Sequence, residues 1–191
     1  GCVQPRAMSR ILRAVATGAT RLGGLLRPRE FFGTTVRAND QAPAVYHIII
    51  IGIVTAAIRL GVGPVPTVGG SPLTGAVVWI AITGLFIAPI ALHLAAAVAT
   101  VMLMMTAPKR AGISMTVQVW AYAATPVVLT AVDQPALTLI GLAAAASLTV
   151  IGTAEVHRLS IRRAVLAAGL PIAIVYGVGL GGFTTVMRLV G

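Results

Sequence analysis

The feature that most constrains this chain is a series of long apolar stretches that contain almost no charged side chain. A helix needs roughly 20 mostly apolar residues, at 1.5 Å each, to cross about 30 Å of hydrocarbon. Five segments meet this requirement, over about residues 43–60, 73–106, 115–132, 136–153 and 164–189. With 58% of its 191 residues hydrophobic and 9% charged, the chain carries more apolar surface than a water-soluble domain buries. The sequence predicts an all-α, polytopic transmembrane bundle of five helices.

The five segments differ in length and in the residues that interrupt them. As one straight helix, residues 73–106 would be about 50 Å long, so this helix must tilt, kink or protrude. Pro89 supplies a kink point. Asp133 to Pro135 leave room only for a tight hairpin between the third and fourth helices, and Asp133 is expected to start this turn or cap the next helix. The fifth helix, predicted over 164–189, carries Pro171 and several glycines.

The basic residues predict the orientation, because arginine and lysine near helix ends resist translocation. Twelve of the fourteen fall on one side of the five-helix arrangement, and only Arg59 and Arg188 fall on the other. This split predicts a cytoplasmic N-terminus and a multi-pass protein of the cell membrane. In so hydrophobic a chain, the formal net charge of +10 indicates anionic lipid head groups as the partner rather than nucleic acid.

Residues 1–41 are predicted to form a basic cytoplasmic segment that precedes a membrane domain at 42–191. Between residues 8 and 26, leucine, isoleucine and valine recur at roughly helical spacing, with Arg10, Arg13 and Arg21 between them. This pattern predicts an in-plane amphipathic helix, with a disordered basic tail as the alternative. The single cysteine, Cys2, permits no intramolecular disulfide and supplies no metal cluster.

The most informative stretch is GTAEVHRLSIRRAVLAAGLP, from Gly152 to Pro171. It resembles the pattern of the Yip family, the Ypt/Rab-interacting five-helix membrane proteins. That pattern has a glycine at the end of helix four, a Glu-Val-His-like turn, a serine, a basic residue followed by alanine, and a proline in helix five. Weaker matches are the run RPREFF at 27–32, Tyr122, and the pair Thr125-Pro126; the resemblance covers about residues 27–188.

The resemblance implies a five-helix fold without a catalytic centre. Eukaryotic members of the family act in vesicle traffic through Rab GTPases and partner membrane proteins. The bias of this chain toward arginine and alanine suggests a GC-rich prokaryote, in which a Rab partner is not expected. We therefore expect the fold to transfer, together with the binding of another membrane protein or a second copy of the chain.

The residues themselves provide no metal-ligand spacing, phosphate-binding loop or nucleophile constellation, so we expect no enzyme activity and no cofactor. His93, near the middle of the second helix, is costly in the membrane unless it faces the protein or water. It is either a neutral imidazole bonded to a carbonyl that Pro89 frees or part of a polar site. Gln118 and Tyr122, four residues apart on the third helix, would line that site opposite His93, or else form hydrogen bonds between helices.

The turn between helices four and five is the candidate contact site. Glu155 is expected to pair with Arg162 or Arg163, and Ser160 to cap helix five. The turn either organises the structure or docks a partner or lipid, together with the N-terminal basic residues; the candidates are Arg10, Arg13, Arg21, Arg27, Arg29, Glu155, His157, Arg158, Arg162 and Arg163. Gly177 and Gly181, four residues apart, are expected to allow close helix packing.

The sequence therefore favours a non-enzymatic membrane module that binds another protein, and organises the bilayer, through its basic cytoplasmic face. The alternative is a small-solute or ion permease that uses a polar path near His93, Gln118 and Tyr122.

Overall fold

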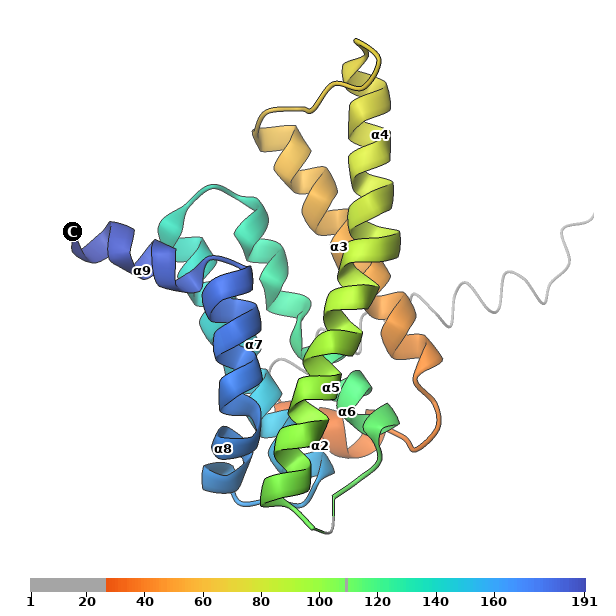
Figure 1. Ribbon diagram of the computed structural model, residues 1–191, viewed down its shortest axis with the longest axis vertical. Coiled ribbons are helices and arrows are strands. Elements are labelled where there is room, and N and C mark those ends of the chain that lie inside the picture. Colours follow the sequence, from red (N-terminus) through yellow and green to blue (C-terminus); the bar gives the residue numbers. More distant parts are fainter. Residues whose placement is uncertain (1–26, 109) are drawn as a thin grey trace, which may run out of the picture.

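The computed structural model describes residues 27–108 and 110–191, and every regular element in this part of the chain is a helix (Figure 1). The predicted amphipathic helix at 8–26, with Arg10, Arg13 and Arg21, lies outside the described residues. The α-helices are α2 (Pro28–Thr35), α3 (Ala42–Val62), α4 (Pro72–Ile82), α5 (Ala88–Thr106), α6 (Ile113–Ala123), α7 (Pro135–Val156), α8 (Ile161–Ile172) and α9 (Gly182–Val190). Two π-helical segments, η1 (Thr83–Ile87) and η3 (Ala173–Gly179), and one 3-10 segment, η2 (Thr125–Ala131), interrupt them.

The described helices give four membrane-spanning candidates, or five if one bent pair of short helices is counted as a single span. Four of them are long and apolar enough to span a membrane: Ala42–Val62, Pro72–Thr106, Pro135–Val156 and Ile161–Gly179. The fifth is the pair α6 and η2, which bends by 41°. Pro126 follows the bend and has no N–H to donate to the preceding turn. The prediction of a helical membrane bundle is confirmed.

The second span is one helix of 35 residues, which is about 52 Å at 1.5 Å per residue. Its π-helical segment η1 directly precedes Pro89, the predicted kink point. There the helix crosses α3 closely, because a Cβ on Gly52 would lie 2.9 Å from the Cβ of Ala88, and one on Gly84 would lie 2.4 Å from Cγ1 of Ile53. The backbones approach this closely because these positions lack side chains.

The core of the bundle surrounds α6, in which all residues from Thr116 to Ala123 are buried. Helices α3, α5 and α7 pack around it, and α2 packs against α7. Many of the buried residues are alanines, such as Ala96, Ala121 and Ala145. Small side chains let the helices approach closely, which favours association in lipid, where the hydrophobic effect contributes little.

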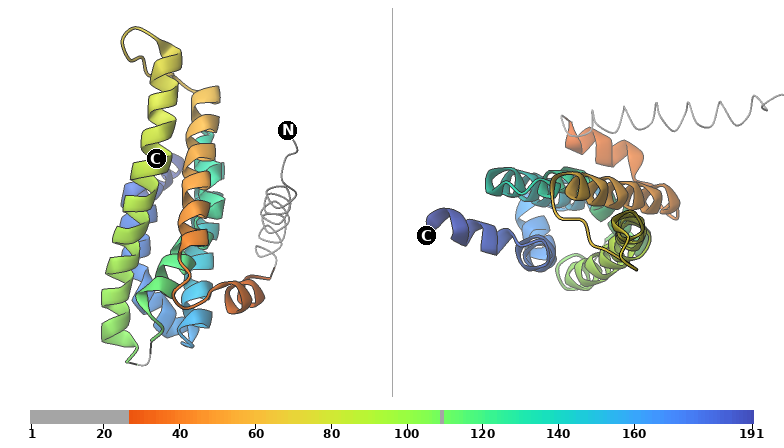
Figure 2. Two further views of the ribbon diagram at one scale, coloured as in Figure 1. Left: turned by 90° about the vertical axis from the view of Figure 1, so that its right-hand side faces the viewer. Right: turned by 90° about the horizontal axis from the view of Figure 1, so that it is seen from above.

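The fifth helix is shorter than predicted. The chain leaves it after Gly179, Gly181 adopts a left-handed conformation with φ 72°, and α9 then lies across the bundle axis (Figure 2). A Cβ on Gly177 would lie 2.4 Å from the ring of Phe183, so α9 folds back onto η3. The prediction that Gly177 and Gly181 share one packing face is therefore wrong, since Gly181 is the turn residue. The close approach is at Gly182 instead, where an added Cβ would lie 2.6 Å from the Tyr176 carbonyl oxygen and 3.2 Å from Cδ1 of Leu142.

Candidate functional site

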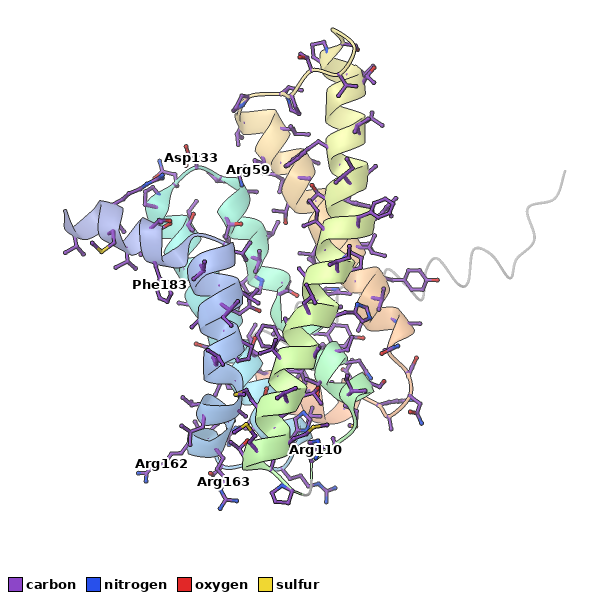
Figure 3. All side chains as sticks on the ribbon, viewed as in Figure 1. Arg59, Arg110, Asp133, Arg162, Arg163 and Phe183 are labelled. Atoms are coloured by element: carbon purple, nitrogen blue, oxygen red, sulfur yellow. The ribbon has the colours of Figure 1, made fainter. Side chains whose placement is uncertain are left out.

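Seven arginines gather at one end of the bundle, which we call the basic end. They come from four segments: the start of α2, the α2–α3 linker, the α5–α6 loop and the turn between α7 and α8. Figure 3 shows Arg110, Arg162 and Arg163 at this end, far from Arg59 and Asp133. The seven are Arg27, Arg29, Arg37, Arg110, Arg158, Arg162 and Arg163. Among the described residues only Arg27 forms an ion pair, at 3.5 Å to Glu30. The others are exposed or half-buried, so their charges face solvent or head groups.

Helix α2 is attached to the bundle by its aromatic residues. Phe32 is 2% exposed, and its ring atoms lie 3.0 Å from the position of a Cβ on Gly152 of α7. Phe31 packs edge-on against Tyr122, with ring centroids 5.5 Å apart. These contacts bury one side of the helix and leave Arg27 and Arg29 exposed on the other.

The linker after α2 is fixed by Gln118, which is 1% exposed. The backbone N–H of Arg37 donates to Oε1 of Gln118 at 3.0 Å, and Nε2 of Gln118 donates back to the Arg37 carbonyl at 2.6 Å. A second bond from Nε2 reaches the Ser114 carbonyl. Gln118 therefore satisfies backbone groups of a loop and of its own helix, and not of a neighbouring helix, and it holds the loop that carries Arg37.

The α7–α8 turn has the geometry of a Schellman motif. The amide of Leu159 donates to the Ala154 carbonyl at 2.8 Å, and the amide of Arg158 donates to the Glu155 carbonyl at 3.3 Å. Arg158 occupies the left-handed position, with φ 54°, where glycine is the usual residue. The turn therefore places the Arg158 side chain outside the bundle at a conformational cost of about 1 kcal/mol.

The predicted ion pairs and cap of this turn are absent. Glu155 forms no ion pair with Arg162 or Arg163 among the described residues. It is exposed and lies beside α2 instead, with its Oε1 3.6 Å from the position of a Cβ on Gly33. Ser160 does occupy the N-cap position of α8, but its side chain makes no capping hydrogen bond.

His157, a candidate contact residue of this turn, is buried, with 2% exposure. Its Nδ1 accepts from the Ala111 amide at 3.1 Å, and its Nε2 lies 3.3 Å from the hydroxyl of Thr116. Burial, together with the nearby positive charge of Arg110, lowers the pKa of His157 to about 4. The imidazole is neutral at pH 7 and joins the α5–α6 loop to the end of α7.

A cavity of about 520 Å³ lies beside this histidine at the basic end. Its walls are the α5–α6 loop on one side and the α7–α8 turn on the other. It is lined by Ala107, Pro108, His157, Arg158, Leu159 and Arg163. Two arginines at the rim of an open, partly apolar cavity suit an acidic group carried on a less polar chain.

The three residues of the permease alternative have different surroundings. His93 is exposed on α5, and its Nδ1 lies 2.7 Å from the Pro89 carbonyl. That carbonyl belongs to the proline itself and is not one that the proline frees. Tyr122 is buried, with its ring 5.3 Å from that of His47, whose Nε2 lies 3.0 Å from the Thr125 hydroxyl. Within the described part of the chain, none of the three lines the cavity beside His157 or the cavity between Arg59 and Arg188.

The sequence identified Gln118 and His157 as candidates, but it did not show how they organise the basic end. The partners of Gln118 and His157 are backbone groups of Arg37 and Ala111, and an amide carries no signal in the amino-acid sequence. The mutual approach of Arg59, Asp133 and Arg188 at the opposite end was also missed, because these residues are far apart along the chain.

The comparisons with known proteins found one related family. The family model of the Yip1 domain matches residues 23–182. No curated protein and no solved structure matched.

Proposed function

This chain belongs to the Yip1 domain family of integral membrane proteins, and from that premise we propose that it is a non-enzymatic module that binds another membrane protein through its basic end. In this proposal the basic end faces the cytoplasm, and the protein resides in the cell membrane. The partner contributes an acidic cytoplasmic segment, and anionic lipid head groups occupy the same face when the partner is absent.

One observation carries this proposal: seven arginines from four separate segments converge on a single end, and three acids, Glu30, Asp40 and Glu155, accompany them. An unpaired cationic surface of this kind attracts anions over a Debye length, which is about 8 Å at physiological salt. Because six of the seven arginines make no ion pair within the described part of the chain, their charge is available to a partner.

The basic end is also held in place before any partner arrives. Phe32 anchors α2, Gln118 fixes the linker that carries Arg37, and His157 joins the α5–α6 loop to α7. A surface whose backbone is already ordered loses less conformational entropy on binding. The hydrogen bonds of Gln118 and His157 therefore support a docking role as well as stability.

The proposal is tested by recovering co-purifying proteins on the tagged chain in a mild detergent. Changing Arg158, Arg162 and Arg163 together to glutamine should lower recovery of a specific partner about a hundredfold, at about 1 kcal/mol for each arginine. The matched control changes Arg59 and Arg188, at the other end, to glutamine and should leave recovery unchanged. Recovery should also fall as salt is raised, because exposed charges are screened.

Two results would count against docking through the basic end. The first is partner recovery that survives the triple arginine change. The second is recovery that collapses with His93→Leu, accompanied by loss of solute flux in proteoliposomes. The second result would favour the permease alternative.

A further inference from the structure

The end opposite the basic end contains a larger cavity, of about 750 Å³. It lies between the α3–α4 hairpin, the turn that joins η2 to α7, and helix α9. Apolar side chains form much of its wall, and charged side chains stand at its rim. Its lining includes Arg59, Val62, Val65, Trp79, Asp133 and Arg188.

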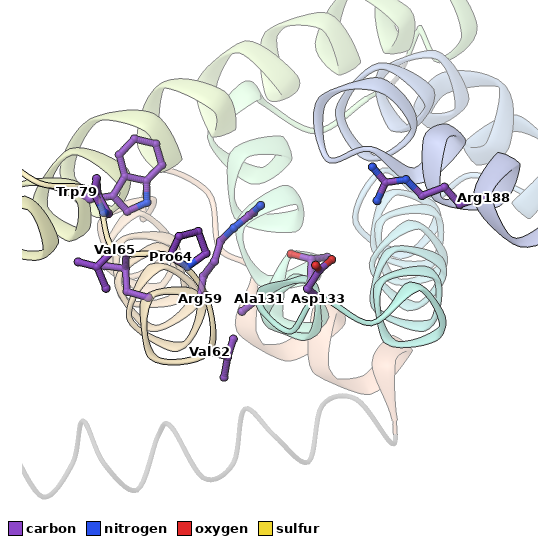
Figure 4. Close-up of a pocket in the computed structure, with 12 residues that line it drawn as sticks. Arg59, Val62, Pro64, Val65, Trp79, Ala131, Asp133 and Arg188 are labelled. Atoms are coloured by element: carbon purple, nitrogen blue, oxygen red, sulfur yellow. The ribbon is translucent and has the colours of Figure 1, made fainter.

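All the charged side chains that the described chain has at this end line this one cavity. Arg59 comes from α3, Asp133 from the turn before α7, and Arg188 from α9. Figure 4 shows the two guanidinium groups directed into the same space, with the carboxylate of Asp133 between them. None of the three forms an ion pair among the described residues. The cavity therefore has a net charge of +1, carried by two separate guanidinium groups.

The position of the cavity relative to the bilayer follows from the length of α7. This helix begins at Pro135, two residues after Asp133, and runs for 22 residues to the basic end. At 1.5 Å per residue it is about 33 Å long, which is close to the thickness of the hydrocarbon. Arg59, Asp133 and Arg188 therefore lie at head-group depth, with Trp79 close by, where tryptophan is enriched in membrane proteins.

We propose that this cavity binds the phosphate group of a phospholipid in the leaflet opposite the basic end. Arg59 and Arg188 donate hydrogen bonds to the phosphate oxygens from two sides, which suits the planar donor geometry of guanidinium groups. Trp79 of α4 lies in the wall of the same cavity and contacts the glycerol end of the bound lipid, whose acyl chains run from there toward the centre of the bilayer. The Asp133 carboxylate accepts a hydrogen bond from a hydroxyl of the head group, and its negative charge disfavours ligands of high negative charge.

Quenching of Trp79 fluorescence by brominated lipids tests this proposal at the site itself. The chain has two tryptophans, so the Trp120→Phe variant of the full chain, purified in maltoside detergent, reports on Trp79 alone. Brominated phosphatidylglycerol should quench at a much lower lipid fraction than brominated diacylglycerol, which has the same chains but no phosphate. Should Trp120→Phe fail to fold, the quenching of Trp79 is obtained by subtracting the quenching measured in the Trp79→Phe variant from that measured in the parent chain.

Substitutions test which side chains cause the preference for phosphatidylglycerol over diacylglycerol. Changing Arg59 and Arg188 to glutamine should reduce the preference for phosphatidylglycerol about tenfold to thirtyfold. The matched pair Arg162→Gln and Arg163→Gln should leave the quenching of Trp79 unchanged, because lipid bound at the basic end lies about 33 Å away, across the length of α7. Asp133→Asn should raise the preference, because a negative charge next to the phosphate is removed.

A second arm distinguishes a lipid from a soluble ligand. Inorganic phosphate at millimolar concentration should not displace the brominated phosphatidylglycerol if the acyl chains contribute to binding. Displacement that depends on Arg59 and Arg188 would retain the phosphate site but overturn the lipid assignment. Equal quenching by the two brominated lipids, or a preference that survives the double arginine change, would overturn the proposal altogether.

Discussion

Acidification from about pH 7.5 to pH 5 should destabilise the fold through His157. In the folded protein the imidazole accepts a hydrogen bond from the Ala111 amide and is neutral, with its pKa lowered from 6.5 to about 4. The unfolded chain therefore binds a proton on this residue more readily than the folded chain does. The stability that His157 contributes is fully present above pH 6.5 and is lost as the pH falls toward 4.

The size of this effect follows from the two pKa values. At pH 5 the unfolded imidazole is almost fully protonated, whereas about a tenth of the folded imidazole is, so the difference amounts to about 2 kcal/mol. This loss is a substantial fraction of the stability of a typical domain, about 5–15 kcal/mol. Because the histidine joins the α5–α6 loop to α7, we expect the loss of stability to begin with separation of this loop from α7 at the basic end.

The measurement is thermal unfolding in detergent across this pH range, for the parent chain and for His157→Gln. Glutamine can still accept from the Ala111 amide and donate to Thr116, but it does not titrate. The variant should therefore lose markedly less stability on acidification than the parent chain, whereas the control His93→Gln, at an exposed histidine, should keep the dependence. Equal losses in the parent chain and in His157→Gln would refute the assignment of the acid sensitivity to this imidazole.

Three further predictions concern the packing, the turn and the orientation. Gly152→Ala should lower the unfolding temperature and reduce the free energy of unfolding by about 1–3 kcal/mol, because the new methyl group would meet side chains of α2 and α6 at 2.9–3.0 Å. The control Gly169→Ala, which places a methyl group in open space, should leave the unfolding temperature unchanged. Arg158→Gly should raise stability by up to about 1 kcal/mol in thermal unfolding, because glycine adopts the left-handed conformation without strain. With Cys2 removed, single cysteines at Gly70 and Gly112 should be labelled from opposite sides of the membrane, and labelling from the same side would contradict the proposed orientation.

The fold was predictable from the sequence where one physical requirement dominates. Spanning hydrocarbon requires about 20 apolar residues, so four of the five predicted spans are single long helices, and the other is the bent pair α6 and η2 near Pro126. The break at Gly181 was not predictable, because residues 164–189 are apolar on both sides of it, and only the contact between Phe183 and Gly177 shows that α9 turns away. Hydropathy records how apolar a segment is and not where it bends.

The candidate site was predictable only in its charge. The arginines of the basic end were identified because their distribution along the chain follows a rule of membrane insertion. The roles of His157 and Gln118 were not, because a buried polar side chain is positioned by its hydrogen-bond partners, and here these are backbone amides and carbonyls from other segments. The orientation, and the contact roles of the arginines, remain predictions.

The unequal lengths of two spans have a mechanical consequence for the surrounding bilayer. The span Pro72–Thr106 has 13 residues more than α7, which adds about 20 Å to its length. Its C-terminal end packs with α8 at the basic end, through Leu103, Ala107 and Ala167. The excess therefore stands at the other end, where Leu73 and Val77 of α4 are exposed. A flat bilayer matched to α7 leaves these apolar turns in water, whereas one matched to α4 and α5 submerges Arg59 and Arg188. Lipids that match both spans must extend their chains on one side of the protein and compress them on the other, which costs a fraction of a kcal/mol per ångström of mismatch. The protein therefore makes the bilayer thicker on one of its sides than on the other.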